Sequence, residues 1–378
     1  MNKSLLLLLC IIVLCSCTNK SIYPIDNPFL GNCDSTFLYR SDSVVRINIG
    51  GYLNPNPSAS QFYKDSFGSY YIMLDENCLY LLDLNSGKQV KKDLSCCGRL
   101  NNYSGFLYLG DTLFVYAYKD KIAFMLNKND DIMKKWLVKD KSLSEHPVDV
   151  EAITDFPMLY IPPKLFMSGS SLGSLEGKDL QKYPVECSID INESIISYSV
   201  EYPEQYRLAD FGGVYMNNVY HSVANDGNIV YSFPTDHSVH FYSDDMSYKK
   251  SVYMGSRYSD VINSSNQNSM ELFKDKEQRI RYYISQHSYA RVLYDKYRGL
   301  YYRIAQHPLL DWDGGNFVKP FSIIVMNEEG ELLCETPIVE DYSSLNLHNM
   351  HVTEEGLLIH YHRYLYKHKV IIVKQQYI

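Results

Sequence analysis

From about residue 35 onward, apolar and polar residues alternate in short stretches rich in Tyr, Val, Ile and Phe. Clusters of Asn, Asp and Gly separate these stretches, and a helical period of 3.6 residues is rare. One unit recurs: an apolar strand, a tight turn and a more polar strand, as in Leu79 to Leu84, Asn85-Ser86-Gly87 and Lys88 to Leu94. This pattern predicts β-hairpins and an all-β fold.

Three further copies of this hairpin follow along the chain. The apolar strands of the four copies end at Leu84, Leu126, Tyr242 and Met326, which are 42, 116 and 84 residues apart. The first and last gaps fit a period near 42. A period of about 40 to 50 residues with four strands per unit is typical of a β-propeller. The chain length then predicts six blades, at about residues 67–95, 105–138, 148–203, 213–256, 289–338 and 347–376.

The last predicted blade has only three clear strands, near His348 to Thr353, Gly356 to Tyr361 and Lys369 to Lys374. The segment Thr36 to Ile49 alternates as a strand does, and we expect it to supply the fourth strand. Pairing of the two chain ends would close the ring and cover an edge that otherwise favours aggregation. The sequence therefore predicts one six-bladed β-propeller domain over residues 35–378.

A single segment, Ser269 to Gln286, breaks the β pattern. Its apolar residues are spaced for one helical face, and they are Met270, Phe273, Ile280 and Ile284. Ser269 is a suitable helix N-cap, so we predict a helical insertion near residues 266–288. In a propeller, this insertion shares one end of the ring with the loops Gln306 to Lys319 and His362 to His368, and that end is predicted to be rich in loops.

The first residues form a separate unit. Lys3 gives a positive start, Leu5 to Val13 are apolar except for Cys10, and Leu14-Cys15-Ser16-Cys17 resembles a lipobox. A membrane-spanning helix needs roughly 20 apolar residues, and this segment is shorter. It therefore predicts a cleaved signal peptide over residues 1–16, with Cys17 carrying diacylglycerol and an acyl chain such as palmitate.

Residues 17–34, rich in Asn, Pro and small polar residues, are predicted to be the lipidated N-terminus and its tether. Thr18 and the residues after it lack an acidic run, which favours the outer membrane with the protein facing the periplasm. Exposure on the cell surface is the alternative. An ordinary secretory signal, in which Cys17 is incidental, is the competing interpretation of the N-terminus.

The net charge and the cysteine content exclude two classes of protein. The net charge is −8, with 36 basic and 44 acidic residues mixed along the chain, which disfavours nucleic acid. Six cysteines follow Cys17, too few for a disulfide scaffold in a chain of this length. The neighbours Cys96 and Cys97 could form a vicinal disulfide, but buried free thiols are the commoner fate.

The C-terminal half carries a resemblance to a known family. The residues concerned are Tyr-Ala-Arg-Val-Leu-Tyr-Asp-Lys-Tyr-Arg-Gly-Leu-Tyr-Tyr-Arg from Tyr289, Phe-Ser-Ile-Ile-Val-Met-Asn from Phe321, and Thr-Glu-Glu-Gly-Leu at 353–357. These resemble the domain-of-unknown-function family numbered 4221, found in lipoproteins of the Bacteroidota and similar to six-bladed propellers. The resemblance implies a fold and a location, and it carries no catalytic residues.

One loop is a candidate binding site. Asp311-Trp312-Asp313-Gly314-Gly315-Asn316 places two carboxylates and an amide beside one of only two tryptophans. A Trp can stack on a sugar ring while the polar groups bind its hydroxyls. The alternative is a polar turn whose Trp covers a blade edge. With Tyr364, from a loop expected at the same end, the candidate binding residues are Asp311, Trp312, Asp313, Asn316 and Tyr364.

The remaining groups of polar residues do not predict a metal site or a catalytic site. His360 and His362 point to one face of a predicted strand, but a third ligand is missing, so we predict no metal and no cofactor. Glu354 and Glu355 lie in a turn, where solvated charge is expected. A nucleophile elbow, an HExxH motif and nucleotide-binding glycine loops are absent, so we identify no catalytic residues.

These observations favour a membrane-anchored, non-catalytic propeller that binds a protein or a glycan of the cell envelope through its loop-rich end. The alternative is a hydrolase or lyase acting on polysaccharide or peptidoglycan, with carboxylates in the central channel. A purely structural envelope component is the third possibility.

Overall fold

The structure is a computed structural model of the chain. It describes residues 38–47, 53–54, 57–139, 148–170, 180, 183–259, 261–265, 267, 269–309, 311–315, 317–338, 345–361 and 368–375. Of residues 38–47, 361 and 368–375, only the backbone is described. The predicted signal peptide, Cys17 and the tether lie outside these ranges.

The strands form six four-stranded antiparallel sheets, which we number along the chain. Sheet 1 contains β2 (Ala59–Lys64), β3 (Ser69–Asp75), β4 (Cys78–Asp83) and β5 (Gln89–Asp93). Sheet 2 contains β6 (Gly105–Tyr108), β7 (Thr112–Ala117), β8 (Ile122–Asn127) and β9 (Ile132–Leu137). Sheet 3 contains β10 (Leu159–Ile161), β11 (Lys164–Ser168), β12 (Glu186–Asp190) and β13 (Ile195–Ser199).

The second half of the chain follows the same scheme. Sheet 4 contains β14 (Tyr220–Val223), β15 (Ile229–Ser232), β16 (Ser238–Tyr242) and β17 (Tyr248–Tyr253). Sheet 5 contains β18 (Ser288–Asp295), β19 (Leu300–Gln306), β20 (Phe321–Asn327) and β21 (Leu332–Ile338). Sheet 6 contains β22 (Leu345–Thr353), β23 (Gly356–Tyr361), β24 (His368–Gln375) and β1 (Leu38–Ile47).

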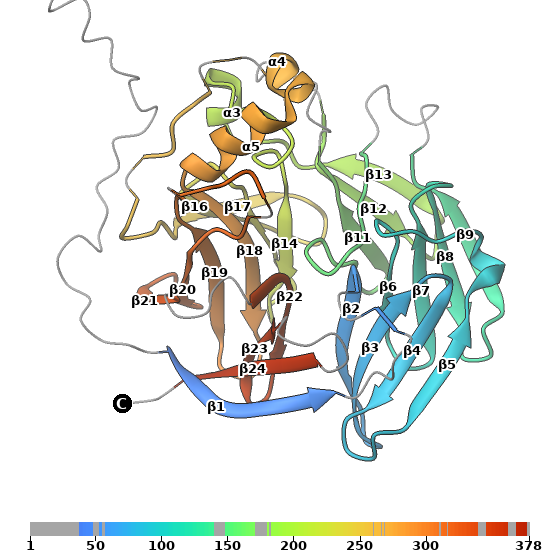
Figure 1. The fold of residues 1–378 in the computed structure, drawn as a ribbon. Helices are drawn as coiled ribbons and strands as arrows, with labels where there is room; N and C mark the ends of the chain where they lie inside the picture. The colour runs from blue at the N-terminus through green and yellow to red at the C-terminus, as the bar shows by residue number, and fades with distance from the viewer. Residues whose placement is uncertain are drawn as a thin grey trace, which may run out of the picture.

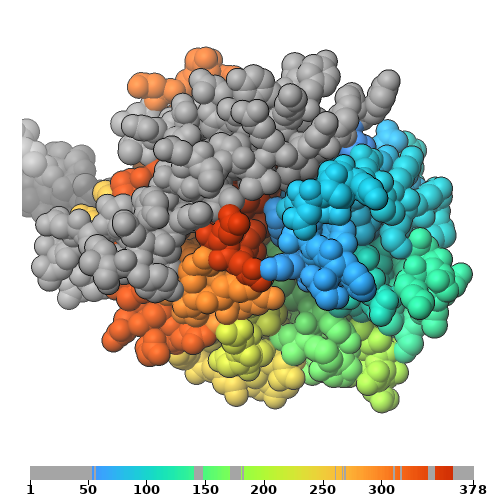
Figure 2. Space-filling view, turned by 90° about the horizontal axis from the view of Figure 1, so that it is seen from below, coloured from blue at the N-terminus to red at the C-terminus, as the bar shows by residue number. Residues whose placement is uncertain are grey.

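These sheets are arranged as in a β-propeller. The first strands of the sheets lie inside, where β2 contacts β6 and β22, and β18 contacts β14 and β22. The fourth strands β5, β9 and β17 are largely exposed, which places them on the outside. Seen from below, the chain colour runs around the molecule from blue through green and yellow to orange (Figure 2). The all-β prediction is thus confirmed.

The predicted joining of the two chain ends is also confirmed. β1 pairs with β24 in antiparallel register, with Val45 opposite Val370 and Tyr39 opposite Lys374. The two strands lie side by side in Figure 1. The first predicted blade was drawn too short, since β2 begins at Ala59 and not near residue 67. β2 escaped prediction because most of its residues are only half-buried, so its apolar alternation is weak.

The helical insertion differs in detail from the prediction. It contains two helices, α4 (Ser269–Lys274) and α5 (Lys276–Ser285), which lie with the short α3 (Gln205–Leu208) at one end of the molecule (Figure 1). Asp275 separates α4 from α5 by capping α5, because its carboxylate accepts a hydrogen bond from the backbone N–H of Gln278. The break turns α4, so Met270 and Phe273 are exposed and Leu272 is buried in their place.

The adjacent cysteines Cys96 and Cys97 lie in a one-turn 3₁₀ helix, Ser95–Cys97, that follows β5. Their sulfur atoms are 3.8 Å apart, so they are free thiols. Cys97 is buried and Cys96 is exposed, and burial raises the pKa of the Cys97 thiol. None of the helices in the described part of the chain has the length and hydrophobicity needed to cross a bilayer.

Buried polar side chains join neighbouring sheets. Arg303 of β19 is fully buried, and its guanidinium donates to Ser232 Oγ and to the carbonyls of Phe233, Asp236, His237 and Met254, all in sheet 4 or just beyond its strands. The guanidinium also lies over the Tyr289 ring, 3.8 Å from its centroid. Burial lowers the pKa of Arg303 to about 10, which leaves it charged at neutral pH.

We predict that Arg303→Lys lowers the free energy of unfolding by roughly 3 kcal/mol or more, because a single ammonium cannot satisfy five buried acceptors. Arg207→Lys, at an exposed position on α3, is the control and should change it by no more than about 0.5 kcal/mol. Urea denaturation measures both. Equal stability of the two variants would contradict this role of Arg303.

Removal of β1 should expose the edge of β24. A chain that starts after residue 47 should unfold several degrees lower than one that starts after residue 37, and it should self-associate, because an unpaired edge accepts a strand from another molecule. Thermal denaturation and size-exclusion chromatography measure the two effects. Identical behaviour of the two chains would show that β1 adds nothing to the ring.

Candidate functional site

Two irregular inner strands bring polar side chains to the centre of the ring. In β18 the pairing register shifts between Tyr289 and Val292. In β22 it shifts between Asn346 and Met350. A bulge redirects the side chains at the extra residues, and bulges are common next to binding sites. The residues within these two shifts include Arg291 and His348.

A third element reaches the centre from the chain that precedes sheet 3, Val150 to Phe156. It passes so close to β6 that a Cβ at Gly105 would lie 1.3 Å from the Ala152 carbonyl oxygen, so only glycine fits there. Hydrogen bonds fix it to sheet 1, since the Thr154 hydroxyl accepts from the Ser60 N–H at 2.8 Å. Phe156 stacks on Tyr220 of β14, with ring centroids 5.1 Å apart.

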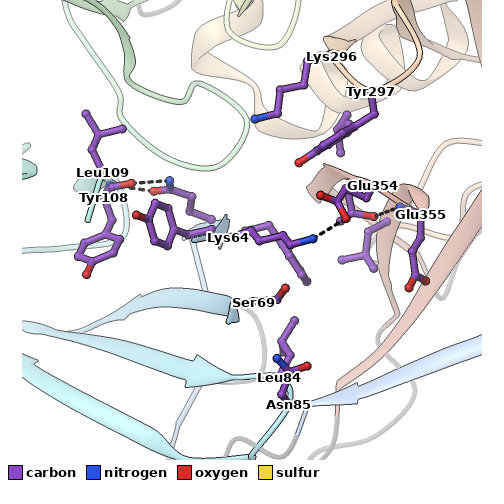
Figure 3. A pocket seen from close by; sticks show the side chains of 16 residues that line it. Lys64, Ser69, Leu84, Asn85, Tyr108, Leu109, Lys296, Tyr297, Glu354 and Glu355 are labelled. Atoms are coloured by element: carbon purple, nitrogen blue, oxygen red, sulfur yellow. Dashed lines mark hydrogen bonds and ion pairs between the residues drawn. The ribbon is translucent and has the colours of Figure 1, made fainter. Parts of the chain in front are cut away.

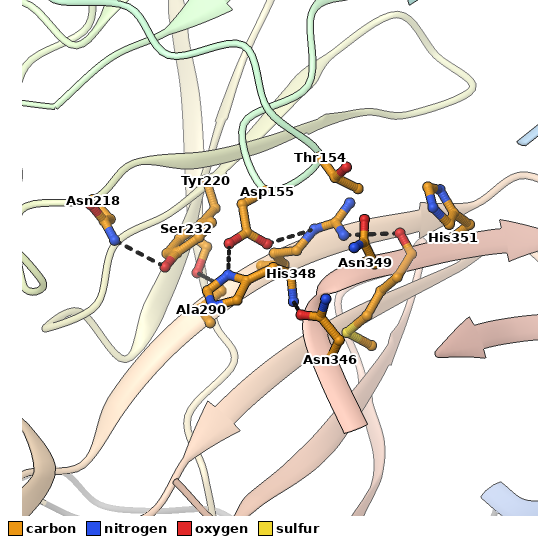
Figure 4. A network of polar contacts seen from close by, with 12 residues as sticks. Thr154, Asp155, Asn218, Tyr220, Ser232, Ala290, Asn346, His348, Asn349 and His351 are labelled. Carbon is orange, nitrogen blue, oxygen red and sulfur yellow. Dashed lines mark hydrogen bonds and ion pairs between the residues drawn. The ribbon is translucent and has the colours of Figure 1, made fainter. Parts of the chain in front are cut away.

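Asp155, Arg291 and His348 come together there and form what we call the axial cluster. Figure 4 labels Asp155 and His348, whose side chains point toward each other. The Asp155 carboxylate bonds the Nδ1 of His348, and its other oxygen lies 3.9 Å from the Nε of Arg291. Arg291 also donates to the Met350 carbonyl at 2.9 Å. Asp155 and Arg291 are almost fully buried, whereas 77 % of the His348 side chain is exposed.

Neighbouring amides and a second histidine hold the cluster in place. Asn346 accepts a hydrogen bond from the backbone N–H of His348 at 3.0 Å. Asn349 accepts from Ser60 Oγ at 2.8 Å, and Ser60 Oγ also lies 3.0 Å from Nε2 of His351. Burial, together with the Arg291 charge, lowers the pKa of His351 to about 3, so this imidazole is neutral.

The charges of the axial cluster suit an acidic ligand. The Asp155 charge raises the pKa of His348, and the hydrogen bond between the imidazole and the Asp155 carboxylate adds to this effect. When His348 is protonated, the cluster holds one negative and two positive charges. Because Asp155 occupies Nδ1, the exposed imidazole has its Nε2–H left to donate to an acceptor. The Nε of Arg291 is buried and has no hydrogen-bond partner among the described residues.

The residues predicted from the sequence lie elsewhere, on the loop between β19 and β20. The Trp312 indole donates to the Gly315 carbonyl of its own loop at 2.8 Å, and Arg281 of α5 covers its ring at 5.0 Å. Asp313 accepts from the Gly315 N–H at 3.0 Å, and Asp311 is exposed. These contacts are those of a polar turn, which the sequence analysis gave as the alternative to a sugar-binding site. Asn316 and Tyr364 lie outside the described residues.

The loop and the helical insertion do meet, as the propeller pattern predicts. Leu309 donates from its backbone N–H to the Ile284 carbonyl at 2.8 Å. The buried ammonium of Lys319 donates to the Gln286 carbonyl at 2.7 Å. An aromatic group links the loop to the insertion, since Tyr283 stacks on Tyr215 at 4.7 Å and lies 6.0 Å from Phe317.

The axial cluster escaped the sequence analysis. In the sequence analysis His348 was only the first residue of a predicted strand, and Arg291 was only part of the segment that resembles a known family. The signal present in the sequence is Asn349, which follows His348 directly and breaks the apolar and polar alternation of Leu345-Asn346-Leu347-His348. As for metals, no group of three or more potential ligands occurs within the described ranges. His360 is buried in β23, and His362 is not described.

Comparison with known proteins gives the family. Residues 102–337 match the family described as Domain of unknown function (DUF4221). This chain belongs to the DUF4221 family. No curated protein matches it.

Solved structures resemble this DUF4221 protein in fold. A member of the DUF4221 family from Bacteroides vulgatus is 15 % identical, with a TM-score of 0.72 over 90 % of this chain and 98 % of that chain. A putative exported protein from Bacteroides fragilis is 10 % identical, with a TM-score of 0.54 over 90 % of this chain and 96 % of that one. At these identities the similarity concerns the fold alone.

We predict that Asp155→Asn lowers the pKa of His348, because it removes the charge that stabilises the imidazolium. NMR titration of the imidazole measures this, and Asp313→Asn, on the exposed loop, is the control that should leave it unchanged. The raised pKa means that the imidazolium stabilises the folded state below its unfolded pKa of about 6.5, and that this contribution is lost as pH rises through the folded pKa.

The stability difference between wild type and Asp155→Asn should therefore shrink as the pH rises. An unchanged His348 pKa in Asp155→Asn would show that the carboxylate does not control this imidazole.

Proposed function

We propose that this DUF4221 protein is a non-catalytic binding protein of the cell envelope that captures an acidic group of a glycan or a protein at the axial cluster. The observation that carries the proposal is the exposed imidazole of His348, held by the buried Asp155 beside the buried Arg291. A donor that is oriented in advance loses little entropy on binding, which favours affinity. The excess positive charge selects ligands that carry a carboxylate.

The proposal includes the complete six-bladed ring. Sheet 6 acts as the sixth blade, because β22 contacts both β2 of sheet 1 and β18 of sheet 5. The same strand carries His348, so the binding site depends on the closing blade. The loop that carries Trp312 and the helical insertion lie at the end where the inner strands begin, and Arg291 and His348 lie in the first halves of β18 and β22.

Anchoring of the protein through lipid on Cys17 is likewise proposed, with the outer membrane and a periplasmic orientation as the location. The support is the lipobox-like Leu14-Cys15-Ser16-Cys17, together with the resemblance described in the sequence analysis to a family found in lipoproteins of the Bacteroidota. An anchored protein of this kind would present the axial cluster to glycans or proteins of the envelope.

A second candidate function uses the same residues. An imidazole whose Nδ1 is held by a carboxylate and whose Nε2 is exposed is also the arrangement of a general base. It would act in a lyase or hydrolase on polysaccharide or peptidoglycan. The raised pKa of His348 favours the binding function over the catalytic one. It keeps the imidazole protonated up to a higher pH, whereas a general base must be neutral.

A glycan array probed with the full chain separates these functions. We expect retention of oligosaccharides that contain uronic acids over their neutral counterparts, at mildly acidic pH, with weaker retention as the pH rises and His348 loses its proton. His348→Gln should reduce this binding roughly tenfold, since a hydrogen bond to a charged group contributes about 1.5 kcal/mol or more. Release of reducing ends in parallel would favour the enzyme.

The paired substitution of Trp312 and Tyr364 tests the loop predicted from the sequence, and it should weaken binding if the ligand extends over that loop. Equal retention of acidic and neutral glycans, or full retention by His348→Gln, would rule out the axial cluster as the binding site. Blank results in both assays would favour a structural component.

A further inference from the structure

A cavity of about 620 Å³ lies at the other end of the ring from the helical insertion. Its walls include the turns that join first and second strands in sheets 1, 5 and 6. These turns lie where the inner strands end. The helical insertion and the Trp312 loop lie at the other end of the sheets, where the inner strands begin. The size is that of a pocket for a small molecule, for which about 300 to 1,000 Å³ is usual. The axial cluster is not among its lining residues.

The charged wall of this cavity is rigidly built. Asp295, whose side chain is fully buried, accepts hydrogen bonds from the N–H groups of Tyr297 and Arg298, which fixes the β18–β19 turn. Arg298 then reaches sheet 6 and donates to the carbonyls of Thr353 and Glu354, at 3.3 and 2.6 Å. The turns of two sheets are therefore locked together beside the cavity.

The opposite wall is fixed in a similar way. The Gln61 side chain donates to the Tyr108 carbonyl and accepts from the Tyr108 N–H, both at 2.8 Å. Tyr63 and Tyr108 pack edge to face, with centroids 5.0 Å apart. These contacts join sheets 1 and 2 and leave aromatic surface on the cavity. A ligand would therefore meet a preformed site.

Charges of both signs line the cavity (Figure 3). Lys64 and Glu354 form an ion pair of 2.5 Å between sheets 1 and 6, and each side chain is about half exposed. Lys296 lies over the Tyr297 ring at 5.2 Å. No carboxylate partner of Lys296 or cationic partner of Glu355 occurs in the described part of the chain.

The Lys64–Glu354 pair restricts which ligands fit. An exposed ion pair contributes only about 0 to 1 kcal/mol, so a ligand can separate it. An anionic ligand that took Lys64 would leave Glu354 without a partner, and a cationic ligand that took Glu354 would leave Lys64 without one. A ligand that carries both charges satisfies both residues, with Lys296 as a second contact for its carboxylate.

We propose that this cavity binds a small zwitterion, such as an amino acid or a short peptide. The ligand carboxylate lies between Lys64 and Lys296, its ammonium meets Glu354, and its side chain packs on the rings of Tyr297, Tyr63 and Tyr108. This site is separate from the axial cluster and does not depend on the function proposed for it. Glu354 and Glu355 line this cavity, whereas the sequence analysis expected them to be only solvated charges in a turn.

Isothermal titration of the full chain with L-alanyl-L-tyrosine tests the proposal. The dipeptide should bind saturably at millimolar concentration or below, and its N-acetylated and C-amidated forms should bind roughly five- to tenfold more weakly, since each lacks one charge. Lys296→Gln should weaken binding of the free dipeptide and reduce the discrimination against the amide. Glu354→Gln should abolish the discrimination against the N-acetyl form.

Two control variants make the result specific. Lys249→Gln removes the ammonium of an exposed residue in β17, and His348→Gln disrupts the axial cluster. Both variants should bind the dipeptide as the wild type does. The proposal is overturned if the wild-type chain shows no saturable binding of the free dipeptide. It is equally overturned if the charge-blocked forms bind as well as the free dipeptide.

Discussion

Polar side chains buried between sheets determine how the ring is assembled, and Arg303 is the clearest case. Apolar packing alone would let neighbouring sheets slide, since it has no direction. The Arg303 guanidinium instead donates to five acceptors in sheet 4 or just beyond its strands, and these directional contacts favour one placement of sheet 5 against sheet 4. Glu186 joins sheets 3 and 4 in a similar way, because His221 and Tyr231 both bond its carboxylate, at 3.0 and 2.9 Å.

The axial cluster extends this principle to the centre of the ring. Arg291 and His348 belong to the inner strands of neighbouring sheets, and Asp155 comes from a segment that is not part of any sheet. Their contact therefore requires that three separately folded parts be placed accurately. The same interaction that fixes the three parts also leaves the imidazole of His348 exposed and oriented, so the proposed binding site and a structural contact coincide at this position.

Much of the fold could be predicted from the sequence, because a blade is local. Hairpins with short polar turns produced the repeat, and the alternation of Thr36 to Ile49 predicted the strand that pairs with β24. The weakly patterned β2 and the break at Asp275 were missed, since the first lacks alternation and the second depends on a capping contact. The axial cluster could not be predicted, because its members are separated by up to 193 residues and two of them lie at bulges.

The pairing of β1 with β24 also governs the order in which the molecule can mature. Val45 and Val370 are partners, yet they are 325 positions apart, so the first strand to be synthesised waits for one of the last. Sheets 1 to 5 use consecutive strands and can form while the chain is still emerging. Sheet 6, with His348, is completed only when the whole chain is present. A molecule that lacks the last part of the chain would thus lack both the pairing of β1 with β24 and the strand β22 that carries His348.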